Sequence, residues 1–250
     1  MAIIYKTPEE IELMSISGQI LADTFKYIKR FIKAGISTYE IDKIIEEYIL
    51  SRNAIPAFKG YNGFPAASCI SVNEVVVHGI PSKEKILKNG DIVSIDIGVI
   101  KNNYCADAAF TYEIGQISKK AKKLVDITKE ALKKGIEQIY PGNRLSNISY
   151  AIQSYAEKNN FSVVRQFVGH GIGQKMHESP QVPNFGKKNN GIILKPGLVL
   201  AIEPMINEGV AEVVILSDGW TAVTRDKKLS AHFEHTVAVT ENGALILTEF

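Results

Sequence analysis

The stretch Ile86-Leu87-Lys88-Asn89-Gly90-Asp91-Ile92-Val93-Ser94-Ile95-Asp96 occurs again in altered form as Ile193-Leu194-Lys195-Pro196-Gly197-Leu198-Val199-Leu200-Ala201-Ile202-Glu203. Five aligned positions are identical, and both copies place a carboxylate six residues after the glycine. We interpret each copy as a turn at the glycine followed by a strand that carries the acidic residue. Two such strands related by a pseudo-two-fold axis would bring their carboxylates to a shared centre. A chance similarity between two ordinary turn–strand units is the alternative, and the length of the match weakens it.

The order of the predicted elements supports a duplication. Capping boxes at Thr7–Glu10 and Ser37–Glu40 predict two helix starts, and further helices are predicted over Ser118–Gln138 and Ser146–Asn159. Runs rich in β-branched and aromatic residues predict strands over Ala67–Val72, Ile92–Ile97, Tyr104–Ile114, Val163–Phe167, Leu198–Ile202, Glu212–Leu216 and Phe233–Thr240. The sequence helix, helix, strands therefore occurs twice, which indicates an α+β fold.

The composition is that of a globular protein. The chain has 250 residues, of which 45% are hydrophobic and 22% charged, so it can bury a substantial core. A net charge of +2 is too small to indicate a nucleic-acid footprint, so we expect no direct nucleic-acid partner. Two cysteines, Cys69 and Cys105, favour a reducing compartment. Because no stretch has the length of a membrane span or of a signal peptide's apolar region, we expect a cytoplasmic protein without a membrane partner.

Two aspartates lie inside apolar runs. Asp96 lies in Val93–Ile97, and Asp107 follows eleven residues later, in Tyr104–Phe110. The turn-like link Lys101–Asn103 predicts a hairpin with both carboxylates on one face. Two facing carboxylates repel each other unless a proton or a cation lies between them. Neither strand contains Lys or Arg, so we expect a bound cation.

Two glutamates repeat this pattern, and one histidine joins them. Glu203 ends the apolar run Leu198–Ile202, and Glu234 lies in a strand-like run that begins at His232. A structural salt bridge is the simpler interpretation of any one buried carboxylate, but four of them on apolar strands favour a metal site. His170 lies between glycines, on a predicted loop open to a metal or a substrate. This donor set suits two divalent ions such as Mn, Fe, Co or Zn in a hydrolytic site.

The other histidines are less distinctive. His78 and His177 lie at predicted loop starts, where a structural role and a functional one are equally well supported. His232 and His235 are interpreted as groups behind the ligands or at the surface rather than as ligands.

At this point the order Asp, Asp, His, Glu, Glu resembles that of the methionine aminopeptidase family. The resemblance is carried by Cys69–Pro81 (CISVNEVVVHGIP), Gly169–Gly173 (GHGIG) and Phe233–Thr236 (FEHT), and it extends over essentially the whole chain. A gap of 31 residues between Glu203 and Glu234 leaves no room for the helical insertion of type II members, so the chain is similar to type I. We expect one catalytic domain over residues 1–250, without an N-terminal extension.

The resemblance implies the pita-bread fold, with two pseudo-symmetric halves, a central antiparallel sheet and helices outside. It implies metal-dependent hydrolytic removal of the initiator methionine from nascent proteins, with a preference for a small second residue. It also implies a monomer that meets nascent polypeptide N-termini near the ribosome.

The family pattern implies a role for each matching residue. The ligands of two divalent ions would be Asp96, Asp107, His170, Glu203 and Glu234, with Asp107 and Glu234 bridging. Glu203 would also act as general base, while His78 and His177 would contact the scissile peptide and stabilise its tetrahedral intermediate. The methionine pocket would be formed by Tyr61, Phe64, Cys69 and Trp220, with Met176 beside it. For Phe64 and Met176, a plain core role competes with this one.

The chain departs from the family pattern at several positions. Gly98 replaces a common hydroxyl residue two positions after the first ligand, and Met176 replaces a more usual Phe. Alanines stand around the second ligand, at Ala106, Ala108 and Ala109. Missing hydroxyl groups near the ligands would weaken metal binding and slow turnover.

Two other functions compete. An Xaa-Pro aminopeptidase or prolidase would share this catalytic half, but such enzymes carry a large N-terminal domain that we do not expect here. A non-catalytic binding module of the same fold would be expected to have lost ligands, whereas all five stand in this sequence. Activity on Met-Ala and Xaa-Pro peptides would distinguish a methionine aminopeptidase from a prolidase-like enzyme. Metal content would distinguish it from a non-catalytic binding module.

Overall fold

The computed structural model describes residues 2–249. Its helices are α1 (Pro8–Ile28), α2 (Thr38–Ser51), α3 (Lys119–Ile136) and α4 (Leu145–Lys158), with a short 3-10 helix η1 at Tyr61–Gly63. The strands are β1 (Ile55–Pro56), β2 (Ser68–Val72), β3 (Val75–Val77), β4 (Ile92–Lys101), β5 (Tyr104–Glu113), β6 (Ser162–Val163), β7 (Gly169–Gly171), β8 (Glu178–Val182), β9 (Val199–Ile202), β10 (Met205–Asn207), β11 (Val213–Ile215), β12 (Ala222–Thr224), β13 (Ser230–His232), β14 (His235–Thr240) and β15 (Gly243–Ile246).

The helix starts follow from local capping. Thr7 and Ser37 each accept a hydrogen bond from the backbone three residues on, and the glutamate there accepts one in return, so both predicted capping boxes are confirmed. Ser118 caps α3 more simply, since its hydroxyl accepts the Ala121 N–H without a glutamate in return. Helix α4 begins at Leu145, one residue before the predicted start, because the Ser146 hydroxyl donates to the Asn190 carbonyl across the loop instead of capping.

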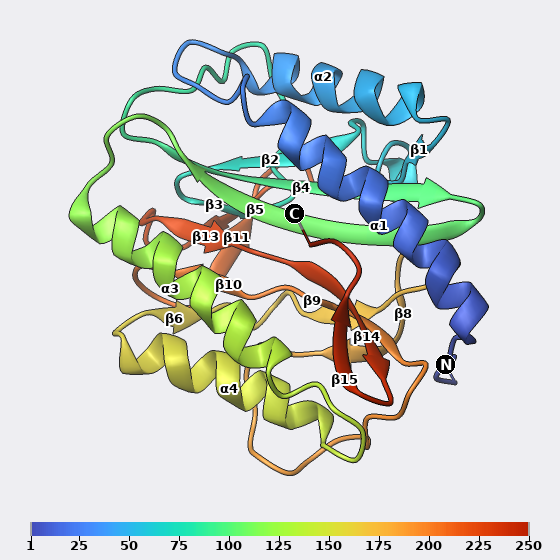
Figure 1. Ribbon diagram of the computed structural model, residues 1–250. Helices are drawn as coiled ribbons and strands as arrows, with labels where there is room; N and C mark the ends of the chain where they lie inside the picture. The colour runs from blue at the N-terminus through green and yellow to red at the C-terminus, as the bar shows by residue number, and fades with distance from the viewer. Residues whose placement is uncertain (1, 250) are drawn as a thin grey trace.

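Two antiparallel sheets make up most of the interior. One joins β1, β4 and β2, with β5 paired to β4, and the other runs β15-β14-β9-β7-β8. They meet at β5 and β14, where the Glu234 N–H donates to the Ala109 carbonyl at 2.9 Å. Helices α1 and α2 lie over the first sheet, and α3 and α4 lie over the second half of the molecule (Figure 1). The predicted pita-bread fold is confirmed.

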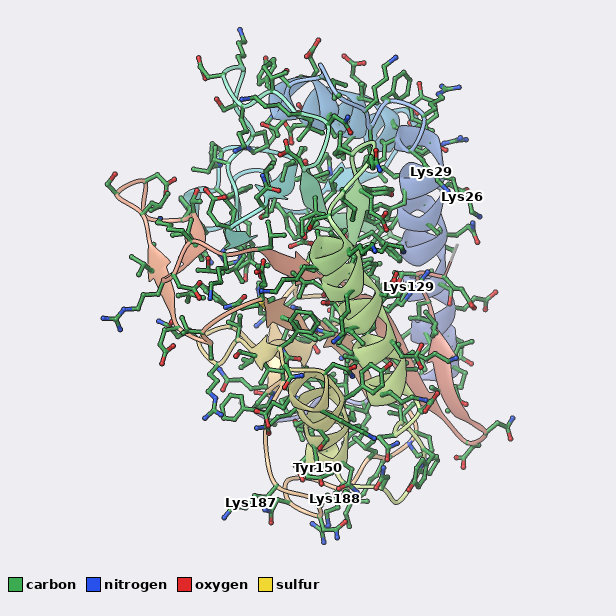
Figure 2. The ribbon with its side chains drawn as sticks, turned by 90° about the vertical axis from the view of Figure 1, so that its left-hand side faces the viewer. Lys26, Lys29, Lys129, Tyr150, Lys187 and Lys188 are labelled. Atoms are coloured by element: carbon green, nitrogen blue, oxygen red, sulfur yellow. The ribbon has the colours of Figure 1, made fainter. Side chains whose placement is uncertain are left out.

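The helices bury one face and expose the other. Lys26 on α1, Lys29 just after its end and Lys129 on α3 are exposed (Figure 2). Within residues 2–249, none of the helices combines the length and the apolarity that a membrane crossing requires.

The duplication extends beyond the stretch in which the sequence shows it. Ile86 and Ile193, the first residues of the two copies, form bridges with Ser37 and Arg144, which cap α2 and α4. Matching backbone hydrogen bonds surround each bridge. In the first half, the Leu87 N–H donates to the Ile36 carbonyl at 2.9 Å and the Gly35 N–H donates to the Leu87 carbonyl at 2.8 Å. In the second half, the Leu194 N–H donates to the Asn143 carbonyl at 2.8 Å and the Gly142 N–H donates to the Leu194 carbonyl at 2.9 Å. Each half also has its own large apolar core. The two glycine-initiated strands are therefore equivalent elements of two related halves.

Three strand predictions need correction. Of the predicted strand Val163–Phe167, only Val163 lies in a sheet, because β6 (Ser162–Val163) has just two paired positions on β10. His170 was predicted on a loop but lies in β7, paired with Ala201 of β9. Glu234 precedes β14 rather than lying within it.

Candidate metal centre

The five predicted ligands line one cavity of about 220 Å³. Asp96 and Asp107 come from β4 and β5 of the first half. From the second half, His170 comes from β7, Glu203 directly follows β9, and Glu234 directly precedes β14. The cavity therefore lies where the two halves meet, as the duplication predicted.

Strand register places the two aspartates together. Asp96 pairs with Ala109, and Gly98 pairs with Asp107, so the two carboxylates project from the same face of the β4–β5 hairpin. In the second sheet, Ala201 pairs with His170 on one side and with Thr236 on the other. This register brings the ends of β7, β9 and β14 next to one another.

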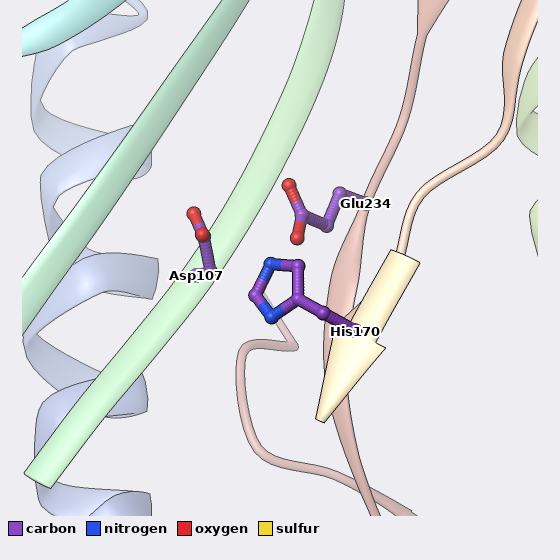
Figure 3. Close-up of side chains that lie close together, drawn as sticks. All are labelled: Asp107, His170 and Glu234. Carbon is purple, nitrogen blue, oxygen red and sulfur yellow. The ribbon is translucent and has the colours of Figure 1, made fainter. Parts of the chain in front are cut away.

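The donor atoms converge as a metal ion requires. Oxygen or nitrogen atoms of Asp107, His170 and Glu234 all lie within 4.8 Å of one another (Figure 3). Asp96 Oδ1, Asp107 Oδ1 and Glu234 Oε1 are buried and have no hydrogen-bond partner within residues 2–249. None of the described residues that line the cavity is Lys or Arg. Buried anionic oxygens without any partner are costly, so a divalent cation fits this site.

The electrostatics support the same interpretation. Burial raises the pKa of Asp96 to about 7. Burial, and then the neighbouring charge of Asp96, raise the pKa values of Asp107 and Glu203 well above their usual range. The pKa of Glu234 is raised by burial and by Asp107. Four carboxylates that repel one another in this way can all ionise only when a cation lies among them.

His170 is prepared to act as a ligand. Its Nδ1 lies 2.8 Å from the Gly171 carbonyl. Because a carbonyl only accepts, Nδ1 carries the proton and Nε2 keeps its lone pair. Nε2 lies 3.6 Å from Glu203 Oε1, and burial lowers the pKa of His170 to about 4, so the ring is neutral at pH 7.

The substrate-side residues share the cavity with the ligands. His78, His177, Tyr61, Phe64, Cys69 and Trp220 all line it. His177 Nδ1 lies 2.8 Å from the Tyr61 hydroxyl, and the Phe64 and Trp220 rings meet edge to face at 5.2 Å. His78 has a left-handed backbone (φ 59°), a strained conformation for a residue other than glycine.

Comparison with known proteins gives the family. The model of metallopeptidase family M24 matches residues 12–241. Methionine aminopeptidase 1 of Bacillus subtilis is 56% identical over 246 residues, covering 98% of this chain and 99% of the relative. This chain belongs to the methionine aminopeptidases of metallopeptidase family M24. Among solved structures, a methionine aminopeptidase from Thermotoga maritima matches with a TM-score of 0.98 and 46% identity over the full length of both chains. A prolidase from Pyrococcus furiosus matches less closely, with a TM-score of 0.79 and 25% identity over 99% of this chain and 66% of the prolidase.

The structure explains one departure of this M24 metallopeptidase from the family pattern. A Cβ on Gly98 would lie 2.7 Å from Phe58 Cε1, 2.8 Å from Met176 Cε and 2.9 Å from Ala57 Cβ. No hydroxyl side chain fits at position 98 unless these groups move. Met176 belongs to the apolar core beside Ala57 and is not among the cavity-lining residues.

Hydroxyl and amide side chains outside the cavity form hydrogen bonds with the backbone of two of the ligands, Asp107 and Glu203. The Thr236 hydroxyl accepts from the Asp107 N–H at 2.9 Å and donates to the Asp107 carbonyl at 2.8 Å. Asn184 donates to the Glu203 carbonyl at 3.0 Å, and His232 Nε2 lies 4.0 Å from Glu203 Oε2. The supporting roles of Thr236 and Asn184 were not predicted, since only the fold brings them to the ligands. The cavity-lining residues Phe58 and Asn62 were also missed.

Proposed function

We propose that this chain hydrolyses the peptide bond after an N-terminal methionine, using two divalent ions held by Asp96, Asp107, His170, Glu203 and Glu234. The observation that carries the proposal is the convergence of these donors, three of them with orphaned buried oxygens, beside a cavity lined by aromatic rings and a thiol. The names of the full-length relatives support the substrate.

Bound divalent ions supply Lewis acidity, which polarises a carbonyl and lowers the pKa of water from 15.7 towards about 7. The protein's part is to hold the ions and to direct protons. Glu203 combines both tasks, since its carboxylate faces the cavity and its backbone is held by Asn184. It takes a proton from the attacking water and returns it to the leaving amine.

His78 and His177 donate hydrogen bonds to the carbonyl oxygen as it becomes anionic. His177 is suited to this because it is exposed to the cavity and its Nδ1 already bonds to Tyr61. The strained backbone of His78 holds its ring against Phe167, with ring centres 5.2 Å apart.

The methionine side chain is accepted by Tyr61, Phe64, Cys69 and Trp220. Burial raises the pKa of the Cys69 thiol well above its usual range, so Cys69 is a neutral, polarisable wall for a thioether. Tyr61 and His177 meet at the exposed edge of the cavity, and we propose that these two side chains select for a small second residue.

Oxygen and imidazole donors accept Co, Mn, Fe or Zn, and supply in the cell decides among them. We propose that the protein acts in the cytoplasm, as a monomer, on nascent polypeptide N-termini near the ribosome, without direct nucleic-acid or membrane partners.

A peptide panel tests the activity. The metal-free protein is reconstituted with Fe, Mn, Co or Zn in turn and offered Met-Ala, Met-Leu, Leu-Ala and Xaa-Pro peptides. Release of methionine from Met-Ala, with less from Met-Leu and none from Leu-Ala, is expected. Cleavage of Xaa-Pro with refusal of Met-Ala would establish a prolidase-like enzyme instead.

A further inference from the structure

A buried ion pair joins the N-terminal segment to the loop that carries His177. Lys6 Nζ lies 2.5 Å from Glu178 Oε2, and the two side chains are only 3% and 5% exposed. Removing two charges from water is costly, so such a pair persists only where its partners are held in place. Lys6 is held by its own N–H, which donates to the Gly197 carbonyl at 2.7 Å, and Nζ also donates to the Ile4 carbonyl at 3.1 Å.

Glu178 closes the loop from the other side. The loop comprises residues 172–177, between β7 and β8, and Glu178 is the first residue of β8. Its second carboxylate oxygen, Oε1, accepts the Lys175 N–H at 3.3 Å. A Cβ on Gly173 would lie 2.5 Å from Lys6 Cε and 2.6 Å from Glu178 Oε1, so the ion pair packs directly against Gly173 of this loop.

Two further contacts attach the same loop to the first half of the chain. The Cys105 N–H donates to the Gly173 carbonyl at 2.8 Å. The Gln174 amide donates to the Tyr104 hydroxyl at 3.2 Å, and that hydroxyl donates to Glu10 at 2.7 Å. The start of the loop is therefore fixed by the β4–β5 hairpin, and its end is fixed by Lys6 through Glu178.

His177 depends on this support. Its side chain is exposed, and its ring forms a hydrogen bond with Tyr61 and lies beside the His170 ring, whose centre is 4.2 Å away. Its position is thus determined by the backbone of the loop, and Glu178 is the next residue. A shift of about 1 Å in a group that contacts a transition state lowers a rate by up to about a hundredfold.

We propose that the Lys6–Glu178 ion pair is a positioning pair that holds the His177 imidazole in place for the reaction. The inference rests on the proposed role of His177. The pair itself does not contact substrate, and its effect on turnover passes through His177 alone.

A double-mutant cycle tests this. We expect Lys6→Met to lower kcat on a Met-Ala peptide about tenfold or more, with metal content unchanged and KM changed little. In a His177→Ala background the same substitution should lower kcat no further, because the group being positioned is gone. Lys6→Arg, which keeps the charge, should recover part of the loss. Lys26→Met, at an exposed lysine of α1, is the matched control and should leave kcat unchanged (Figure 2).

The outcomes are distinguishable. Independent losses that multiply in the double variant would show that the pair acts on the fold in general, which overturns the inference and leaves the proposed function standing. If His177→Ala alone kept full kcat, the role proposed for His177 would fail, and the inference would fail with it. If Lys6→Met does not fold, Glu178→Gln replaces it, since this variant keeps the size and an acceptor for the Lys175 N–H.

Discussion

Gly98 and Met176 share one space: a Cβ on Gly98 would lie 2.8 Å from Met176 Cε. The two residues are also two of the departures from the family pattern. A flexible Met176 fills the volume beside a residue that has no side chain. Ala57 limits any adjustment, because its Cβ would lie 2.9 Å from the new atom and cannot rotate away.

Gly98→Ser should therefore destabilise the protein instead of improving the metal site. Overpacking of this kind costs about 1–3 kcal/mol. Urea denaturation measures the free energy of unfolding, and Gly186→Ser is the control, since a Cβ there meets Ser149 Cβ at an ordinary 3.5 Å. Equal stability of the two variants would show that the space around Gly98 adapts without cost.

Removing the metal should make stability depend on pH above about 6.5. The pKa of Asp96 is raised to about 7 from 3.8, so the folded metal-free protein keeps a proton that the unfolded chain releases. That stability is fully present below pH 3.8 and is lost as pH rises through 7. The raised pKa values of Asp107, Glu203 and Glu234 act in the same direction.

The histidines define the useful pH window for this measurement. Burial lowers the pKa values of His78, His170 and His235 to about 4 and that of His232 to about 3, from 6.5. Between these lowered pKa values and pH 6.5, the buried neutral histidines make the protein more stable as pH rises, whereas the carboxylates make it less stable. Above pH 6.5 the histidines no longer contribute to the pH dependence. Between pH 6.5 and about 8.5, chelator-treated protein should lose stability to urea, and Asp96→Asn should lose less. Manganese should remove the fall, because metal affinity rises as the ligands deprotonate. A flat profile without metal would contradict the pKa assignments.

Glu234→Ala should abolish turnover and metal retention together. Glu234 is 2% exposed, and its Oε1 lacks a partner, so the substitution removes a donor from the group formed with Asp107 and His170. Metal content by mass spectrometry and methionine release from Met-Ala measure the two effects, and His170→Ala should behave alike. Glu241→Ala, at an exposed position just after β14, is the control. Retention of both metal and activity by Glu234→Ala would show that the ligand assignment is wrong.

His78→Ala should lower turnover without affecting metal binding, and so separate these two functions of the cavity. His78 lines the cavity but is not in the close donor group, so metal content should be unchanged. Loss of a hydrogen bond to the developing oxyanion should lower kcat about 10²–10³-fold. His78→Asn tolerates the left-handed backbone better than alanine and should fold at least as stably. Loss of metal in both variants would assign His78 to the ligands.

Local signals in the sequence predicted the helices and the long strands well. Capping boxes identify the starts of α1 and α2, and runs rich in β-branched and aromatic residues identify β4 and β5. Short strands such as β7 were not predicted. Strand β7 has three residues, of which two are glycine, and it is extended only because β9 and β8 pair with it. Phe58 and Asn62 were missed for the same reason, since the path of their loop to the cavity depends on tertiary packing.

The Thr236 hydroxyl should matter to the metal centre although it contacts no ligand side chain. It is fully buried and bonds to both the N–H and the carbonyl of Asp107, from the neighbouring sheet. Thr236→Val leaves both groups unpaired, which costs about 1–3 kcal/mol for each buried group. It should also leave Asp107 less firmly positioned and so lower the affinity for metal. The loss of such a supporting contact typically lowers metal affinity about 10–100-fold.

Thr128→Val is the matched control for this loss. Thr128 is equally buried, but its hydroxyl bonds only to the Leu124 carbonyl one turn back in α3, a contact that contributes little to stability. Isothermal titration of both metal-free variants with manganese should show weakened binding for Thr236→Val alone. If the two variants bound manganese equally well, the backbone of Asp107 would be held firmly enough by strand pairing with β4, and the Thr236 hydroxyl would serve stability only.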